Sequence, residues 1–357
     1  MNIFKDILGS DESLFSNPLA LEFDYLPKQV PYRESEQRQI IYCIKPLLHN
    51  MSGKNILVYG KPGVGKTLVI KYILNQLEEE TEDITPLYIN CWQKNTSYKI
   101  MIEICHLLGY KFTHNKNTEE LFDVVKRILN KTSVVFAFDE IDKVEDFDFL
   151  YYILEGIYCK SVILVTNYKE WLIKLDERIR SRLTLQLTEF KPYSYEETKG
   201  ILLQRVNLAF APEVWEDDAL LLIAKKSNDV KDIRIGLHLL KESANIAESE
   251  AKRKVSLKHV EKAILRLDEF AVKSSDQLDK EEKQILELIK NNSGKKIGEL
   301  FELYKAMNGK GVYKTFQRKI EKLARNGFIN VEKIKGGAQG STTIINYKSK
   351  EKKLTEF

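Results

Sequence analysis

The sequence predicts an α/β domain with a parallel sheet, followed by an all-helical domain and a C-terminal winged helix-turn-helix. Three observations lead to this prediction. Strand-like and helix-like segments alternate up to residue 193, and only helical patterns occur over 194–270. The remainder, 271–357, combines three helical patterns with two alternating strands. A chain of 357 residues has room for two or three such domains.

The α/β prediction depends on short apolar runs that are each followed by a helical pattern. The expected strands are 55–59, 87–90, 134–138 and 161–166, and the expected helices are 66–79, 97–108, 119–129 and 147–157. Strands that alternate with helices are typical of parallel sheets, whose carboxyl ends meet at one edge. Polar residues that follow these strands are therefore candidates for a common site.

The helical domain is expected to contain helices over 194–210, 217–226, 231–251 and 256–270. Ser194, with glutamates in the following turn, is a helix start signal. The polar stretch 271–280 indicates a linker. Beyond it we expect helices over 280–290, 297–307 and 312–326, the last capped by Gly327, and strands over 328–334 and 342–347 around a glycine-rich tip.

Composition is that of a globular protein, with 43% hydrophobic and 30% charged residues. No apolar run approaches the ~20 residues of a membrane-spanning helix, and the first residues lack the apolar core of a signal peptide. We therefore expect a cytoplasmic protein that does not enter a membrane. The four cysteines are widely spaced, which favours reduced, packed thiols over a disulfide frame or a zinc site.

Charge is unevenly distributed along the chain. Residues 271–357 contain 19 lysines and arginines against 11 aspartates and glutamates, a net charge of +8, whereas residues 1–270 have a net charge of −4. A basic module on a mildly acidic body favours contact with a polyanion. A solvated, lysine-rich surface is the alternative.

The segment Gly60-Lys61-Pro62-Gly63-Val64-Gly65-Lys66-Thr67 matches the phosphate-loop pattern G-x-x-x-x-G-K-[ST]. It follows an apolar strand and opens a helix. Phosphate binding requires this order, because glycines let backbone N–H groups surround the phosphates and the helix presents its positive end. We expect Lys66 to contact the β- and γ-phosphates and Thr67 to bind Mg²⁺. The residues expected to bind ATP or ADP here are Gly63, Val64, Gly65, Lys66, Thr67 and Leu68.

An acidic pair, Asp139-Glu140, directly follows the most apolar of the predicted strands. We expect Asp139 to hold Mg²⁺ together with Thr67, and Glu140 to orient and polarise the attacking water. A surface Asp-Glu at a strand end is the alternative.

Asn167 follows the strand 161–166, where its amide is expected either to reach the γ-phosphate or the water, or to serve as a turn residue. Three arginines lie within 175–183. In an oligomeric ATPase one such arginine can stabilise charge on a neighbour's γ-phosphate. We favour Arg182 for this role, then Arg178, and an exposed surface cluster is the alternative.

Together these motifs resemble the AAA+ superfamily and, within it, the archaeal origin-recognition replication initiators. The resemblance covers nearly the whole chain. Outside the phosphate loop it depends on the segments Tyr25-Leu26-Pro27, Pro31-Tyr32-Arg33-Glu34, Tyr88-Ile89-Asn90-Cys91 and Asn95-Thr96-Ser97-Tyr98. It implies an AAA+ P-loop NTPase base domain over 1–193, a helical lid over 194–270, and a linker plus winged-helix domain over 271–357.

The resemblance also implies three further nucleotide contacts. Tyr193 is similar to a residue that packs near the adenine, and Arg205 to one that lies near the nucleotide. Arg234, in Asp232-Ile233-Arg234, is similar to the lid arginine that senses the γ-phosphate. The family usually has glycine before that aspartate, and this chain has Lys231.

In the helix 312–326 the apolar residues Val312, Phe316, Ile320 and Leu323 recur at helical spacing, with basic and amide side chains elsewhere. A recognition helix has this layout. The expected DNA contacts are Lys314, Gln317, Arg318, Lys322 and Arg325 in the helix, with Tyr313 and Thr315 as phosphate contacts, and Lys333 and Lys335 at the hairpin. A protein-interaction module with a solvated lysine face is the alternative.

The expected function is that of an ATP-dependent initiator that binds origin double-stranded DNA in the nucleoid, with slow, switch-like ATP hydrolysis. The resemblance implies the MCM replicative helicase and other initiator subunits as partners. The alternative is an ATPase switch for transcription regulation or signalling, whose winged helix binds a promoter or a protein.

Overall fold

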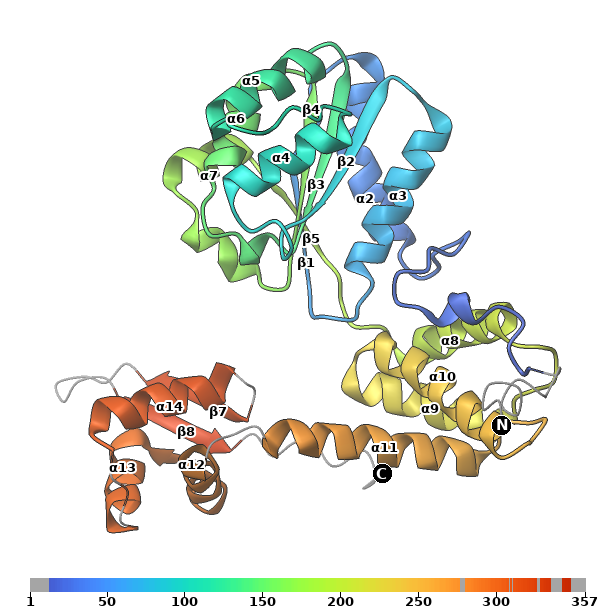
Figure 1. Ribbon diagram of the computed structural model, residues 1–357, viewed down its shortest axis with the longest axis vertical. Coiled ribbons are helices and arrows are strands. Elements are labelled where there is room, and N and C mark those ends of the chain that lie inside the picture. Colours follow the sequence, from blue (N-terminus) through green and yellow to red (C-terminus); the bar gives the residue numbers. More distant parts are fainter. Residues whose placement is uncertain are drawn as a thin grey trace, which may run out of the picture. The chain divides into compact units, whose positions relative to one another are not determined.

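The computed structural model describes residues 13–276, 280–307, 309, 311–325, 328–334 and 342–347 (Figure 1). It contains two compact units, one up to Val255 and one from Ser256 onward. None of the helices in the described ranges is long and apolar enough to cross a membrane.

A five-stranded sheet forms the centre of the first unit. Its strands lie in the order β2-β3-β4-β1-β5, and every neighbouring pair is parallel. The strands are β1 (Ile56–Tyr59), β2 (Ile84–Asn90), β3 (Ser133–Asp139), β4 (Lys160–Thr166) and β5 (Gln186–Glu189). The predicted parallel sheet is confirmed, and the carboxyl ends of β1, β4 and β3 lie side by side.

Helices cover both faces of this sheet (Figure 1). One face packs on α2 (Glu34–Ile44) and α3 (Lys66–Glu80), and the other on α4 (Ser97–Leu107), α5 (Thr118–Leu129), α6 (Asp148–Gly156) and α7 (Glu177–Leu183). Every residue of β3 is buried, because Phe136 and Phe138 pack on the second face while Val135 and Ala137 pack on the first.

Strand β5 was not predicted from the sequence. Of its four residues only Thr188 is buried, and the strand lies at the edge of the sheet beside β1. An edge strand with polar residues has neither the apolar run nor the alternation that marks a strand in a sequence. It matters for the site because β5 leads directly into the segment that enters the lid.

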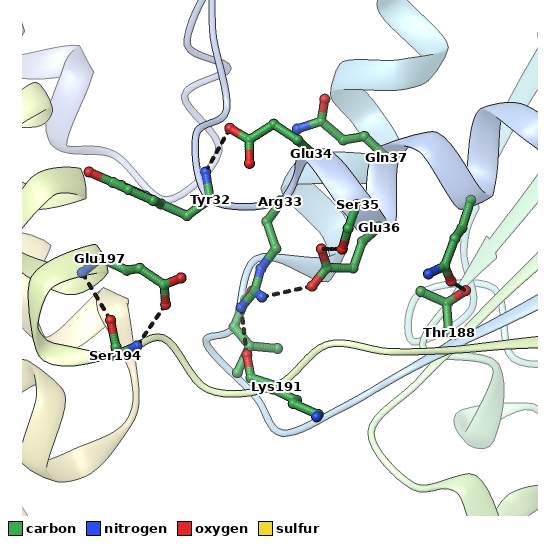
Figure 2. A network of polar contacts seen from close by, with 12 residues as sticks. Tyr32, Arg33, Glu34, Ser35, Glu36, Gln37, Thr188, Lys191, Ser194 and Glu197 are labelled. Atoms are coloured by element: carbon green, nitrogen blue, oxygen red, sulfur yellow. Dashed lines mark hydrogen bonds and ion pairs between the residues drawn. The ribbon is translucent and has the colours of Figure 1, made fainter.

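Three helices form the lid part of the first unit: α8 (Tyr195–Ala209), α9 (Asp217–Val230) and α10 (Ile233–Ser249). Helix α8 begins where the sequence predicts. The Ser194 hydroxyl accepts a hydrogen bond from the Glu197 backbone, and the Glu197 carboxylate accepts one from the Ser194 backbone (Figure 2). The N-terminal segment also packs here, with the Phe15 and Phe210 ring centroids 4.9 Å apart.

The second unit begins with α11 (Leu257–Asp276), a helix of 20 residues. It continues into the stretch 271–280 that the sequence indicates as a linker, so the first part of that stretch is helical. The stretch contains polar residues such as Ser274 and Ser275 but no glycine or proline, and polarity alone does not end a helix.

The rest of the second unit is a winged helix-turn-helix. Its elements are α12 (Lys280–Asn291), β6 (Lys295–Lys296), α13 (Ile297–Ala306), α14 (Tyr313–Arg325), β7 (Ile329–Ile334) and β8 (Thr342–Tyr347). The strands form an antiparallel sheet in the order β6-β8-β7. The three predicted helices and two strands are present, and β6 was missed because two lysines carry no strand signal.

The prediction that Val312 belongs to the buried apolar face of α14 was wrong. Val312 is 66% exposed because it precedes the helix, which begins at Tyr313. Phe316, Ile320 and Leu323 are buried in the core of the unit, as expected. The predicted cap Gly327 and the glycine-rich tip 336–340 lie outside the described residues.

Candidate nucleotide-binding site

The phosphate-loop segment connects β1 to α3 in backbone conformations that favour glycine. Gly63 and Gly65 have φ of 75° and 89°, in the left-handed region where a Cβ is strained. A Cβ on Gly63 would also lie 2.0 Å from a carboxylate oxygen of Asp232. Helix α3 begins at Lys66, directly after Gly65. Its unpaired N–H groups therefore lie at the loop, which is an arrangement that binds phosphate.

Lys66 places a buried cation in this loop. Its Nζ donates to the carbonyl oxygens of Gly60 at 2.7 Å and Lys61 at 3.0 Å, and to Oδ1 of Asn167 at 2.9 Å. Burial lowers the pKa of Lys66, and the nearby carboxylates of Glu140 and Asp139 act in the opposite direction. Because its hydrogen-bond partners are neutral oxygens, the ammonium fits an incoming phosphate.

Asp139 is held by three donors at the end of β3. Its Oδ2 accepts from the Thr67 hydroxyl at 2.6 Å and from the Tyr88 hydroxyl at 2.8 Å, and its Oδ1 accepts from the Glu140 backbone at 2.9 Å. Carboxylate and hydroxyl oxygens, together with phosphate oxygens and water, are the ligands Mg²⁺ uses in nucleotide sites. The Thr67–Asp139 pair therefore fits a magnesium ion that arrives with a triphosphate.

Glu140 follows in a left-handed conformation, with φ of 55°. Burial raises its pKa, and the neighbouring carboxylates of Asp139 and Asp142 add to this. Its Oε2 accepts a hydrogen bond from Nδ2 of Asn167 at 3.1 Å. The Asn167 amide thus joins Glu140 to Lys66, and its expected contact with the γ-phosphate or the water stays a prediction.

The lid contributes Asp232 and Arg234. Asp232 caps α10 by accepting from the Arg234 backbone at 2.9 Å, and its Oδ2 accepts from Arg234 Nη2 at 2.7 Å. The bond with Asp232 raises the pKa of Arg234, and the Glu140 carboxylate adds to this. The backbone N–H of Ile233 donates to the Gly63 carbonyl at 3.4 Å. The lid thus meets the phosphate loop directly through Ile233 and Asp232, and the sensing of the γ-phosphate by Arg234 stays a prediction.

Tyr193 and Arg205 line a narrow cavity of about 40 Å³ between the base domain and the lid. A Cβ on Gly65 would lie 2.7 Å from the Tyr193 hydroxyl, so this ring packs against the loop. Arg205 is buried, and its guanidinium donates to the carbonyls of Ala20 at 3.1 Å and Tyr25 at 3.4 Å. Burial lowers the pKa of Arg205. Leu68, also predicted, lines the same cavity together with Pro27, Val30, Pro31, Ile201, Gln204, Ile233 and Leu237.

Two residues of this site, Arg33 and Tyr88, had no individual role predicted from the sequence. Both stand in segments that carry the family resemblance, which was the available signal. Tyr88 holds Asp139, and Arg33 donates to the Val64 carbonyl in the phosphate loop at 3.2 Å. Neither partner is close in sequence, so neither contact follows from a local pattern.

The arginines of α7 are not brought into this site by any described contact. Arg178 and Arg182 are both exposed. The Arg182 guanidinium is ion-paired with the Glu155 carboxylate and lies 5.4 Å from the Tyr151 ring centroid. The role in a neighbouring subunit's site remains a prediction.

In the winged helix, Lys314 and Arg318 are exposed on α14 and Gln317 between them is half-buried, so three predicted DNA contacts share one open face. Thr315 is exposed, and Tyr313 packs edge-on against Phe301.

Lys322 has a different environment. Its Nζ lies 2.6 Å from the carboxylate of Glu282, which is 2% exposed, and the neighbouring Lys319 is paired with Glu281 in the same way. Lys322 therefore points toward α12. The side chains of Arg325 and Lys333, and the whole of Lys335, lie outside the described residues.

Two family models match this chain. One, described as an AAA domain, matches residues 49–167, and the other, a Cdc6 AAA+ ATPase-type lid domain, matches residues 199–265. Together with the parallel sheet, the phosphate loop and the lid contact at Gly63, they define an AAA+ protein of the Cdc6 type.

Relatives match over nearly the whole chain. The sequence is 32% identical to ORC1-type DNA replication protein 1 of Archaeoglobus fulgidus, over 99% of this chain and 92% of that protein. It is 30% identical to ORC1-type DNA replication protein 1 of Sulfurisphaera tokodaii, over 96% of this chain and 93% of that protein. The chain therefore belongs to the family of ORC1-type DNA replication proteins.

Solved structures share the fold. The Aeropyrum pernix ORC1 protein, solved in complex with DNA, matches with a TM-score of 0.73 and 24% identity over 97% of each chain. Cdc6p from Pyrobaculum aerophilum matches with a TM-score of 0.66 and 18% identity over 96% of each chain. The order of AAA+ base, lid and C-terminal winged helix is thus common to all three.

Proposed function

We propose that this protein is an ATP-binding DNA replication initiator that binds origin double-stranded DNA through its AAA+ core and winged helix. The observation that carries the proposal is the contact between lid and phosphate loop, where Asp232 lies against Gly63. A nucleotide in that loop and the position of the lid cannot be independent. The replication role is supported by the family to which the chain belongs.

The residues present fit MgATP. Lys66 and the amino end of α3 would hold the phosphates, Thr67 and Asp139 would hold Mg²⁺, and Tyr193 and Arg205 would lie at the base side. The bound Mg²⁺ would neutralise phosphate charge during transfer. Glu140, with its raised pKa, is suited to orient a water molecule and accept its proton, and Asn167 keeps Glu140 in place.

We propose slow, switch-like hydrolysis. Arginines that stabilise transition-state charge contribute roughly 10³–10⁵-fold in related phosphoryl-transfer sites. The described contacts of Arg182 are with Glu155, Arg178 and Tyr151, and none of them joins it to the nucleotide site of its own chain. A single copy would then hydrolyse ATP slowly, and a neighbouring initiator subunit would supply the missing arginine.

On DNA, the open face of α14 with Lys314, Gln317 and Arg318 would enter a groove or follow the phosphates. Nucleotide state would set the lid position through Arg234 and Asn167, and thereby the joint grip of core and winged helix on the duplex. The DNA-bound initiator would help load the MCM replicative helicase, in the nucleoid of the cytoplasm.

The site is tested by comparing two lysines of the same loop. Lys66→Ala should abolish binding of a fluorescent ADP analogue, because the buried ammonium is lost. Lys61→Ala should bind like the parent, because the Lys61 side chain is exposed and its carbonyl is retained. Equal affinity of the Lys66→Ala variant and the parent would refute the site.

The cellular role is tested by immunoprecipitation of bound DNA across the genome. Peaks at replication origins support the initiator proposal, whereas peaks confined to promoters favour an ATPase switch for transcription. A duplex affinity that is the same without nucleotide, with ADP and with ATP would contradict the coupling on which the proposal depends.

A further inference from the structure

Arg33 is a buried cation where three chain segments meet. It immediately precedes α2, and its side chain is 5% exposed. Nη1 donates to Oε1 of Glu36 at 2.9 Å (Figure 2). Nη2 donates to two backbone carbonyls, that of Lys191 at 2.6 Å and that of Val64 at 3.2 Å. One guanidinium therefore joins the start of α2, the phosphate loop and the segment after β5.

The flat face of the same guanidinium contacts aromatic rings. Its central carbon lies 3.9 Å from the ring centroid of Tyr193 and 5.3 Å from that of Phe190. A buried cation over an aromatic face is a favourable contact, and arginine makes it more readily than lysine. The Tyr193 hydroxyl in turn lies beside Gly65. The phosphate loop thus touches this assembly twice, through Val64 and through Gly65.

The segment that Arg33 holds leads from the sheet into the lid. Strand β5 ends at Glu189 and α8 begins at Tyr195, so Lys191 and Tyr193 both lie in the connection between them. Arg33 holds this connection at two points, the backbone carbonyl of Lys191 and the ring of Tyr193. A change in the loop at Val64 would therefore act on the connection that sets the lid.

An arginine at position 33 is unfavourable if its side chain serves only to fill space in the core. Within the described part of the chain, Arg33 Nε is buried without a hydrogen-bond partner. A buried donor left unpaired is destabilising. An apolar side chain of similar length would avoid that loss, but it could not donate to Val64 and Lys191 together.

We propose that Arg33 is a positioning residue that couples the phosphate loop to the hinge between base domain and lid. The inference rests on the proposed nucleotide-binding function and extends it to the route by which the lid responds. Two carbonyls and a ring are engaged by one planar group. Lysine keeps the charge but has no planar face and no fork of donors, so it cannot maintain all three contacts.

The test compares Arg33→Lys with Arg38→Lys, which changes an exposed arginine within α2. The dissociation constant of Mg²⁺-ADP is first measured for each protein. It should rise roughly tenfold for Arg33→Lys, about the effect of one lost hydrogen bond to a charged group. Hydrogen exchange of backbone amides over residues 189–200 is then followed with and without ADP, at ADP concentrations that give equal occupancy.

In the parent and in Arg38→Lys, ADP should slow exchange over this segment. In Arg33→Lys most of that slowing should be lost although the site is equally filled, a result that weaker binding alone does not produce. Full slowing in Arg33→Lys, or none in the parent despite bound ADP, overturns the role of Arg33. Failure of the parent to bind ADP instead refutes the proposed function. Arg33→Met, if folded by circular dichroism, should behave like Arg33→Lys, and a parent-like response would also overturn the proposal.

Discussion

Lys231 occupies a backbone conformation that suits glycine, and replacing it should stabilise the lid. Its φ and ψ are 59° and 31°, in the left-handed region, and it directly follows the last residue of α9. The resembled motif usually has glycine at this position. In this conformation a residue with a Cβ is disfavoured by roughly 1–2 kcal/mol relative to glycine. Glycine also makes the unfolded chain more flexible, and this opposes the stabilisation by roughly 0.4–1 kcal/mol. The net gain expected for Lys231→Gly is therefore about 0.5–1 kcal/mol.

The matched control is Lys225→Gly, the same exchange at an exposed position inside α9. At that position glycine should destabilise the protein by about 1 kcal/mol, because a residue inside a helix does not need the positive φ that glycine tolerates. At about 2–4 °C per kcal/mol for a domain of this size, thermal unfolding should place the two variants roughly 5 °C apart, one on each side of the parent. The Lys231–Asn228 hydrogen bond is exposed and should change this little. Equal destabilisation by both substitutions would refute the reasoning.

Three further outcomes are expected. Because burial and neighbouring carboxylates raise the pKa of Glu140, ATP hydrolysis at saturating Mg²⁺ should fall as pH drops through that raised value, and a rate profile with the midpoint of an ordinary glutamate would contradict this. Tyr88→Phe removes a hydroxyl 2.8 Å from Asp139, so the Mg²⁺ concentration for half-maximal hydrolysis should rise roughly tenfold; an unchanged Mg²⁺ titration would argue against that contact. In fluorescence anisotropy, Arg318→Ala should weaken duplex binding and lower its salt dependence, whereas Lys322→Ala should mainly lower stability by removing the ion pair with the buried Glu282 carboxylate; the opposite pattern would reassign the DNA-binding face.

The parts of the site that the sequence predicts share one property: each is set by local order. A strand, a glycine-rich turn and a helix in succession place Lys66 and Thr67, and a fully apolar strand places Asp139 at its end. Parallel topology then brings these ends together without further information. Asn167 follows by the same logic from β4.

The contacts that could not be predicted join residues that are far apart in the sequence. Several of them involve backbone carbonyls, which no residue type identifies. Arg33 bonds carbonyls 31 and 158 residues away, and any residue can supply a carbonyl. The contact of Lys322 was not predictable either, because the helical pattern of α14 placed this lysine on an outward basic face. Only the packing of α14 against α12 shows that it meets Glu282, 40 residues earlier.

Three buried cations, Lys66, Arg33 and Arg205, lie around the loop and the cavity beside it, and they share a pattern of partners. Lys66 is held by two carbonyls and an amide, Arg205 by two carbonyls, and Arg33 by two carbonyls and one carboxylate. Carbonyl partners satisfy donors without cancelling charge, so the hydrogen bonds of Lys66 and Arg205 leave their positive charge in place, whereas Arg33 is also paired with the Glu36 carboxylate. Burial, which lowers the pKa of both Lys66 and Arg205, is the cost of keeping it there. A polyanion relieves that cost when it binds, and Arg33 and Arg205 lie where the base domain meets the lid. We therefore expect nucleotide binding and lid position to be linked by electrostatics as well as by contact, as the proposed switch requires.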